Sequence, residues 1–182
     1  PMIPSLTNPI IDVGAHIGMF SIYSKILNHK SKIIAIEPEQ NNFKLLQANL
    51  KLNNCIDVKT IRAALITGKE LNTKLYLSKN THNHYTFMDP RFHGDDTVVI
   101  PAYAGIQSSI ITVPAINLEQ LIKKYKLKTI GLLKMDIEGA ELEIIQNMEH
   151  RTWNKIRYAV IEYHPAPRVV QGKPVDYLTN II

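Results

Sequence analysis

The start of the sequence passes from a short apolar run through a glycine turn into a helical pattern. Residues 10–13 are β-branched except for Asp12, and the turn Asp12-Val13-Gly14-Ala15-His16-Ile17-Gly18 follows directly. Apolar side chains then recur at helical spacing over residues 19–27. A strand that feeds a helix in this way is the first half of a βαβ unit, so the pattern predicts a parallel sheet with helices packed on it.

The same alternation continues along the chain. Further apolar runs of strand length occur at residues 32–36, 57–61, 130–135 and 157–161. Helical patterns close near Asn53, begin at Leu118 behind an Asn117 cap, and run from Glu138 to about Met148. We therefore predict an α/β fold with a doubly wound, mostly parallel, Rossmann-like sheet.

The middle of the chain interrupts this alternation. Residues 64–113 show no helical period, and residues 74–77 and 109–113 indicate strands around a polar stretch at residues 80–97. We expect a β-hairpin insertion between the third and fourth core strands, at about residues 71–112, within a single domain that spans residues 1–182.

The composition limits the class of protein. Of the 182 residues 45% are hydrophobic and 20% charged, which is typical of one globular domain. The single cysteine, Cys55, excludes an intramolecular disulfide and a cysteine-based zinc site. No apolar run reaches the roughly 18 residues that span a bilayer, and the start lacks the pattern of a signal peptide, so we expect a cytoplasmic protein without membrane insertion. The net charge of +5 is not gathered in one block, and nucleic acid is therefore a disfavoured partner.

The glycine turn indicates which ligand the sheet binds. Ligands of α/β sheets lie beyond the carboxyl ends of the strands, and a dinucleotide site normally has the pattern G-x-G-x-x-G, which brings backbone N–H groups to a pyrophosphate. Here the pattern is D-x-G-x-x-x-G, which suits a nucleoside without a pyrophosphate, such as S-adenosylmethionine. Glu37 ends the second strand, where a carboxylate can bind both ribose hydroxyls. NAD enzymes share that carboxylate, so a nicotinamide-dependent oxidoreductase remains an alternative.

Three stretches carry a resemblance to a known family. They are residues 11–18, residues 36–38 (Ile-Glu-Pro) and residues 133–141, which contain the run K-x-D-I-E-G-A-E. Together they resemble the FkbM-type family of S-adenosylmethionine-dependent methyltransferases over about residues 8–164. The resemblance implies a class I methyltransferase fold and, for several members, O-methylation of hydroxyls on sugars or natural products. A complete sheet of that type adds two further strands, so either the chain is a piece or residues 177–182 begin them.

The cofactor site is expected at the turn and at the ends of the next strands. Ala63 and Ala64 could border an adenine ring or be ordinary core residues, and His16 could meet the cofactor's carboxylate or cap a helix. The residues expected to bind the cofactor are Asp12, Gly14, Ala15, His16, Gly18, Glu37, Pro38, Ala63, Ala64 and Asp136.

The reacting side of the site is expected beyond the fourth and fifth strands. Asp136 and Glu138 follow the fourth strand, and Asp136 is expected to bond the methionine ammonium or the acceptor hydroxyl. His164 follows the fifth strand and is the expected base, because histidine titrates near neutral pH; it could equally be a hydrogen-bonded residue at a strand end. Glu162 is the reserve base.

Two groups of side chains have the character of metal ligands, and one further function fits the sequence. Asp136 with Glu138 could bind a divalent ion, and His82, His84 and His93 have metal-like spacing in a polar loop, but we expect no metal. The expected acceptor is a small-molecule or glycan hydroxyl. A non-catalytic nucleoside-binding or interaction domain is the remaining alternative, and the sequence does not indicate an oligomeric state.

Overall fold

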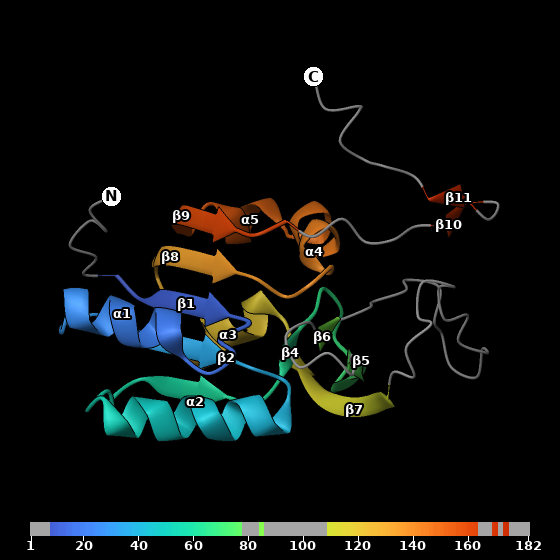
Figure 1. The fold of residues 1–182 in the computed structure, drawn as a ribbon. Coiled ribbons are helices and arrows are strands. Elements are labelled where there is room, and N and C mark those ends of the chain that lie inside the picture. Colours follow the sequence, from blue (N-terminus) through green and yellow to red (C-terminus); the bar gives the residue numbers. More distant parts are fainter. Residues whose placement is uncertain (1–7, 78–83, 86–108, 164–168, 171–172, 175–182) are drawn as a thin grey trace.

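The protein is described by a computed structural model at residues 8–77, 84–85, 109–163, 169–170 and 173–174. The central sheet has five parallel strands in the order β3-β2-β1-β8-β9 (Figure 1). Their bounds are β1 (Ile10–Val13), β2 (Ile33–Ile36), β3 (Lys59–Ile61), β8 (Ile130–Met135) and β9 (Ile156–Ile161). The predicted doubly wound, Rossmann-like sheet is thereby confirmed, and its strand order reverses beside β1.

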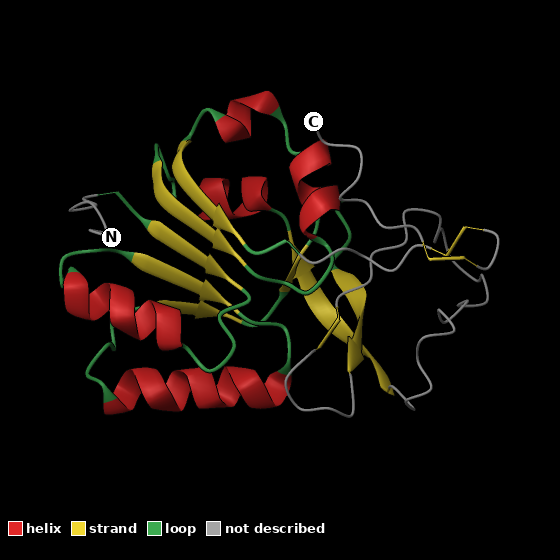
Figure 2. Cartoon of the chain, turned by 45° about the horizontal axis from the view of Figure 1, so that its top comes forward, coloured by secondary structure: helices red, strands yellow, loops and turns green. Residues whose placement is uncertain are grey.

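Helices cover both faces of this sheet. Helices α1 (Met19–Leu27) and α2 (Gln40–Leu52) lie on one face, and α3 (Leu118–Lys124), α4 (Glu141–Asn147) and α5 (His150–Trp153) lie on the other (Figure 2). Since successive side chains of a strand point to opposite faces, β1 contributes to both cores. Ile10 packs with side chains of α1 and α2, while Ile11 and Val13 pack with those of α3 and α4. The predicted Asn117 cap is present, as a capping box with Gln120.

A second group of strands lies beside the central sheet, at the end where the parallel strands terminate. It contains β4 (Ala64–Leu65), β5 (Asn72–Leu77), β6 (His84–Tyr85) and β7 (Ser109–Ile116), in the order β4-β7-β5-β6. Strands β5 and β7 pair antiparallel along six residues each, which agrees with the two strands expected there. Most of the polar stretch between them falls outside the described residues.

The remaining short strands are β10 (Val169–Val170) and β11 (Lys173–Pro174), which pair with each other antiparallel. Among the described residues, no helix combines the length and the apolar character needed to span a bilayer.

Gly18 is required where the turn after β1 meets α2. Its φ is +94°, and a Cβ there would lie 2.7 Å from Cδ1 of the fully buried Leu46. We expect Gly18→Ala to lower the free energy of unfolding by about 1–3 kcal/mol, because both the backbone and the packing must shift. Urea titration followed by circular dichroism measures this.

Gly68→Ala is the matched control, since Gly68 has no positive φ and its Cβ would meet only the end of the exposed Glu70 side chain. Its unfolding free energy should change by less than about 0.5 kcal/mol. Equal losses in the two variants would contradict the packing argument.

Candidate active site

The carboxyl ends of β1, β2 and β8 meet at one edge of the sheet and form a pocket there. Residues from the loops after these strands line it, together with Asn42 of α2 and Leu75 of β5. They are Gly14, His16, Glu37, Pro38, Glu39, Asn42, Leu75, Asp136, Ile137 and Glu138. A smaller apolar cavity adjoins it and shares Gly14, Pro38 and Ile137. Ala63 and Ala64 line that second cavity.

The structure therefore brings most of the residues predicted from the sequence to one place. Gly14, His16, Glu37, Pro38, Asp136 and Glu138 line the main pocket. Asp12, Ala15 and Gly18 line neither cavity, and Asp12 and Ala15 are buried. The N–H of Glu162 donates to the carbonyl oxygen of Met135 at 2.9 Å. Glu162 therefore lies close to Asp136, the next residue, which lines the pocket. His164 lies outside the described residues.

The turn after β1 is fixed by its own backbone. Gly14 has a φ of +71°, and a Cβ there would lie 1.7 Å from the carbonyl oxygen of Asp136, so no other residue fits. The N–H groups of Gly14 and Ala15 both donate to the carbonyl oxygen of Ile36, at 3.0 and 2.9 Å. His16 also has a left-handed backbone, with a φ of +50°. The loop after β1 is thus held against the loops after β2 and β8.

Glu37 joins the first two loops through its carboxylate. It accepts the N–H of His16 at 2.9 Å on one oxygen and the N–H of Glu39 at 2.9 Å on the other. Its side chain is buried, and this burial raises the pKa of Glu37 to about 7, although the two backbone hydrogen bonds oppose the shift. Glu37 thus presents a largely desolvated carboxylate at the pocket.

Beside Glu37, the start of α2 adds a second buried carboxylate to the pocket. Glu39 is the N-cap residue of α2, and its side chain accepts the N–H of Asn42 at 2.7 Å. Glu39 and Asn42 both line the pocket, although neither was predicted from the sequence to be a site residue. The only sequence signal was a capping residue before an amphipathic helix, which predicts a helix start and no ligand contact.

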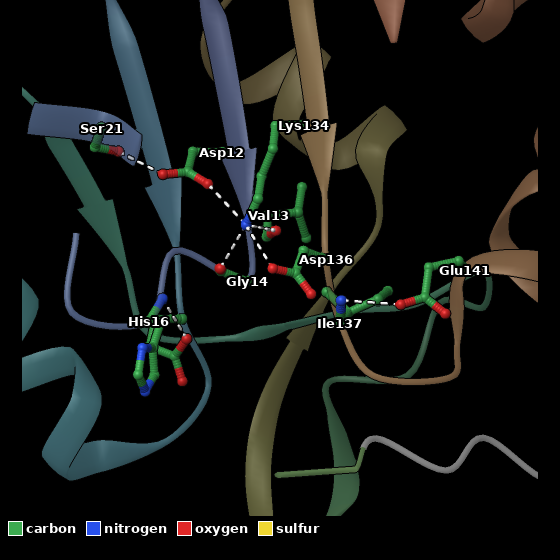
Figure 3. A network of polar contacts seen from close by, with 10 residues as sticks. Asp12, Val13, Gly14, His16, Ser21, Lys134, Asp136, Ile137 and Glu141 are labelled. Carbon is green, nitrogen blue, oxygen red and sulfur yellow. Dashed lines mark hydrogen bonds and ion pairs between the residues drawn. The ribbon is translucent and has the colours of Figure 1, made fainter. Parts of the chain in front are cut away.

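Asp12 is fully buried beneath the turn (Figure 3). One of its oxygens accepts the hydroxyl of Ser21 at 2.7 Å, and the other lies 3.5 Å from Nζ of Lys134. The same ammonium lies 3.4 Å from a carboxylate oxygen of Asp136. Burial raises the pKa of Asp12, while Lys134 and the Ser21 hydrogen bond act against that shift.

The loop after β8 is shaped by a carboxylate that the sequence analysis left without a role. Glu141 is fully buried and accepts the N–H of Ile137 at 3.0 Å and that of Gly139 at 2.9 Å. Between these bonds Glu138 and Gly139 have φ values of +57° and +116°. The helix expected from Glu138 therefore begins only at Glu141, because left-handed residues cannot continue a right-handed helix. This loop places Asp136 and Glu138 at the pocket.

Of the two candidate metal sites, only that of Asp136 and Glu138 lies wholly within the described residues. In the described part of the chain, no three or more His, Cys, Asp or Glu side chains gather as metal ligands would. Asp136 and Glu138 therefore lack a third such side chain among those residues. Of the loop histidines, His82 and His93 fall outside the described residues and His84 begins β6.

The family follows from comparison with known proteins. The model of the methyltransferase FkbM domain matches residues 12–178. The chain belongs to the FkbM methyltransferase family. This membership confirms the resemblance predicted from the motifs at residues 11–18, 36–38 and 133–141.

Curated relatives of the FkbM domain are distant. Methyltransferase sdnD of Sordaria araneosa is 28% identical over 86% of this chain and 66% of its own length. Methyltransferase 1 of Beauveria bassiana is 28% identical over 84% of this chain and 63% of its own length. The 31-O-demethyl-FK506 methyltransferase FkbM of Streptomyces tacrolimicus is 25% identical over 85% of this chain and 65% of its own length. The chain thus spans somewhat less than two thirds of the length of these relatives. No solved structure matches it significantly.

The raised pKa of Glu37 has a consequence for stability that can be measured. Its pKa is about 7 in the folded protein against 4.5 in the unfolded chain, so between these values the folded state binds the proton more tightly. The stabilisation of the folded state by this tighter proton binding is fully present below pH 4.5 and is lost as the pH rises through 7. Relative to Glu37→Gln, which cannot ionise, the wild-type protein should lose up to about 3 kcal/mol of unfolding free energy between pH 5 and 8.

Urea titrations of both proteins at several pH values measure this difference. Asp12 also titrates in both proteins, and the comparison cancels its contribution. Parallel stability curves for the two proteins would show that Glu37 has an ordinary pKa.

Proposed function

We propose that the chain is an S-adenosylmethionine-dependent methyltransferase that methylates a hydroxyl of a small-molecule or glycan acceptor. The observation that carries the proposal is the charge of the pocket. Four carboxylate residues line it, Glu37, Glu39, Asp136 and Glu138, and in the described part of the chain no lysine or arginine does. This lining favours a ligand that carries a sulfonium and an ammonium group, and it repels a pyrophosphate. A nicotinamide cofactor is therefore disfavoured, in agreement with the missing G-x-G-x-x-G pattern.

The residues of the pocket fit the parts of such a cofactor. Glu37 keeps lone pairs on both oxygens after accepting two backbone N–H groups, so it can also accept two ribose hydroxyls. The apolar residues Ala63, Ala64 and Pro38 border the small adjoining cavity, and we expect the adenine ring to lie beside them. Asp136, whose side chain is 31% exposed, can accept a hydrogen bond from the ammonium group of the methionine part.

S-adenosylmethionine supplies an electrophilic methyl group on a positively charged sulfur. The protein must then orient the acceptor oxygen towards that methyl carbon and receive one proton, while the C–O bond forms and the C–S bond breaks. We expect Asp136 and Glu138, which both line the pocket, to orient the hydroxyl. We assign the proton to His164, which follows Glu162 by two residues in the sequence, with Glu162 as the alternative acceptor.

Hydroxyl acceptors are supported by one relative. The Streptomyces tacrolimicus protein is named as the methyltransferase of 31-O-demethyl-FK506, and it shares 25% identity with this chain. The acceptor class proposed here agrees with that name and with an uncharged or cationic molecule, because an anionic acceptor would meet the four carboxylates.

Titration calorimetry with S-adenosylhomocysteine and NAD tests the cofactor. We expect S-adenosylhomocysteine to bind and NAD not to bind. Glu37→Ala should weaken the binding of S-adenosylhomocysteine by more than about 1 kcal/mol, because a charged acceptor of hydrogen bonds is lost. Glu70→Ala, which removes an exposed carboxylate elsewhere, is the control and should bind normally. NAD binding, or unchanged affinity of Glu37→Ala, would refute the proposal.

His164→Ala tests the assignment of the base. The affinity for S-adenosylhomocysteine should stay within about twofold of the wild type, while methyl transfer to the acceptor falls roughly 100-fold or more, the usual contribution of a positioned base. Transfer rates measured with labelled cofactor give the comparison. If the His164 variant keeps the full rate, another group receives the proton, and Glu162→Gln should then lower it.

A further inference from the structure

The ammonium group of Lys134 connects two loops of the pocket. It donates to the carbonyl oxygen of Gly14 at 2.9 Å and to that of Val13 at 3.4 Å. It also lies 3.5 Å from the carboxylate of Asp12 and 3.4 Å from that of Asp136 (Figure 3). An ammonium has only three protons to donate, so these four oxygens use its capacity fully. Its side chain is 14% exposed, and Lys134 itself lines neither cavity.

The register of the sheet explains why these groups meet. Asp12 of β1 is the direct neighbour of Lys134 in β8, and both side chains lie on the face that carries α1. Asp136 is two residues further along the same strand direction and so points to that same face. The loop after β1 and the loop after β8 therefore share one cation at the point where each leaves the sheet.

Lys134 is the main compensation for a fully buried charge. In the described part of the chain Oδ1 of Asp12 has no hydrogen-bond partner, and it forms its ion pair with Nζ of Lys134 at 3.5 Å. A buried carboxylate without a cation is strongly unfavourable. Asp12 thus holds Lys134 in place, and Lys134 in turn holds the carbonyl oxygens of Val13 and Gly14.

We propose that Lys134 is a positioning residue of the cofactor pocket, which fixes the loop after β1 against the loop after β8, and that Asp12 acts on the ligand through Lys134 instead of contacting it. This deepens the proposed function, on which it rests for the identity of the ligand. The closeness of the two loops supports it, because the backbone of Asp136 lies directly against Gly14, where no Cβ fits. A small displacement of either loop would open the side of the pocket that Gly14 and Asp136 both line.

A second buried lysine offers a matched control. Lys25 in α1 is also largely buried, donates to the carbonyl oxygen of Ser31 at 2.8 Å and pairs with Asp57 at 2.6 Å. None of these three residues lines either cavity. Lys25→Met and Lys134→Met therefore remove the same groups, and only the second removal lies beside the pocket.

The first test needs no ligand. Hydrogen exchange followed by mass spectrometry is measured for peptides that cover residues 13–18 and 135–139. In Lys134→Met these amides should exchange at least tenfold faster than in the wild type, whereas in Lys25→Met they should exchange as in the wild type. Unchanged protection in Lys134→Met, or the same increase in both variants, would overturn the proposal.

The second test uses a charge-balanced variant. The double variant Asp12→Asn with Lys134→Met buries no unpaired charge, so its midpoint of urea unfolding should lie closer to the wild type than that of Lys134→Met. If Lys134→Met does not fold, the double variant replaces it in the exchange measurement. An unfolding midpoint no higher than that of Lys134→Met would show that the two side chains are not energetically paired.

The double variant also separates position from stability. Because the carbonyl oxygen of Gly14 has lost its donor, the folded double variant should bind S-adenosylhomocysteine at least tenfold more weakly than Lys25→Met does. Equal affinities would overturn the positioning role. If the wild-type protein binds no S-adenosylhomocysteine, the proposed function fails, and the exchange measurement alone decides on Lys134.

Discussion

The close approach of two loops is the constraint on which the rest of the pocket depends. Gly14 lies so near the backbone of Asp136 that a single Cβ would lie 1.7 Å from a carbonyl oxygen. This contact is possible because β1 and β8 are direct neighbours in the sheet, although more than a hundred residues separate them in the chain. The carboxylate of Glu37 ties the same turn to β2 by accepting the N–H of His16. The ends of three strands are thus joined by backbone contacts and by the carboxylate of Glu37.

The electrostatics of the pocket differ from those of the whole chain. The chain carries a formal charge of +5, whereas the described lining of the pocket has four carboxylates and no lysine or arginine. The ammonium group of Lys134, beneath the turn, contacts Asp12, Asp136 and two carbonyl oxygens. The net charge of the chain is therefore a poor guide to the charge of the ligand, and the carboxylates that line the pocket are a better one.

Much of the fold was predictable because it rests on local patterns. Apolar runs and helical spacing identified the five core strands and the main helices, and the glycine turn located the pocket. The sequence could not assign Glu39 or Glu141, because a capping carboxylate and a buried loop-forming carboxylate look alike in a sequence. It gave no role to Lys134, whose partner Asp12 is a neighbour only through the strand order. The start of α4 was misjudged because Glu141, three residues after Glu138, holds the preceding loop in a left-handed conformation.

We propose that the pocket between β1, β2 and β8 binds S-adenosylmethionine as the cofactor of a methyltransferase. A crystal structure of the protein with S-adenosylhomocysteine tests it most directly. We expect the ribose hydroxyls within hydrogen-bond distance of Glu37, the adenine beside Ala63 and Ala64, and the amino group at Asp136. A ligand that lies elsewhere, or whose ribose makes no contact with Glu37, would contradict it.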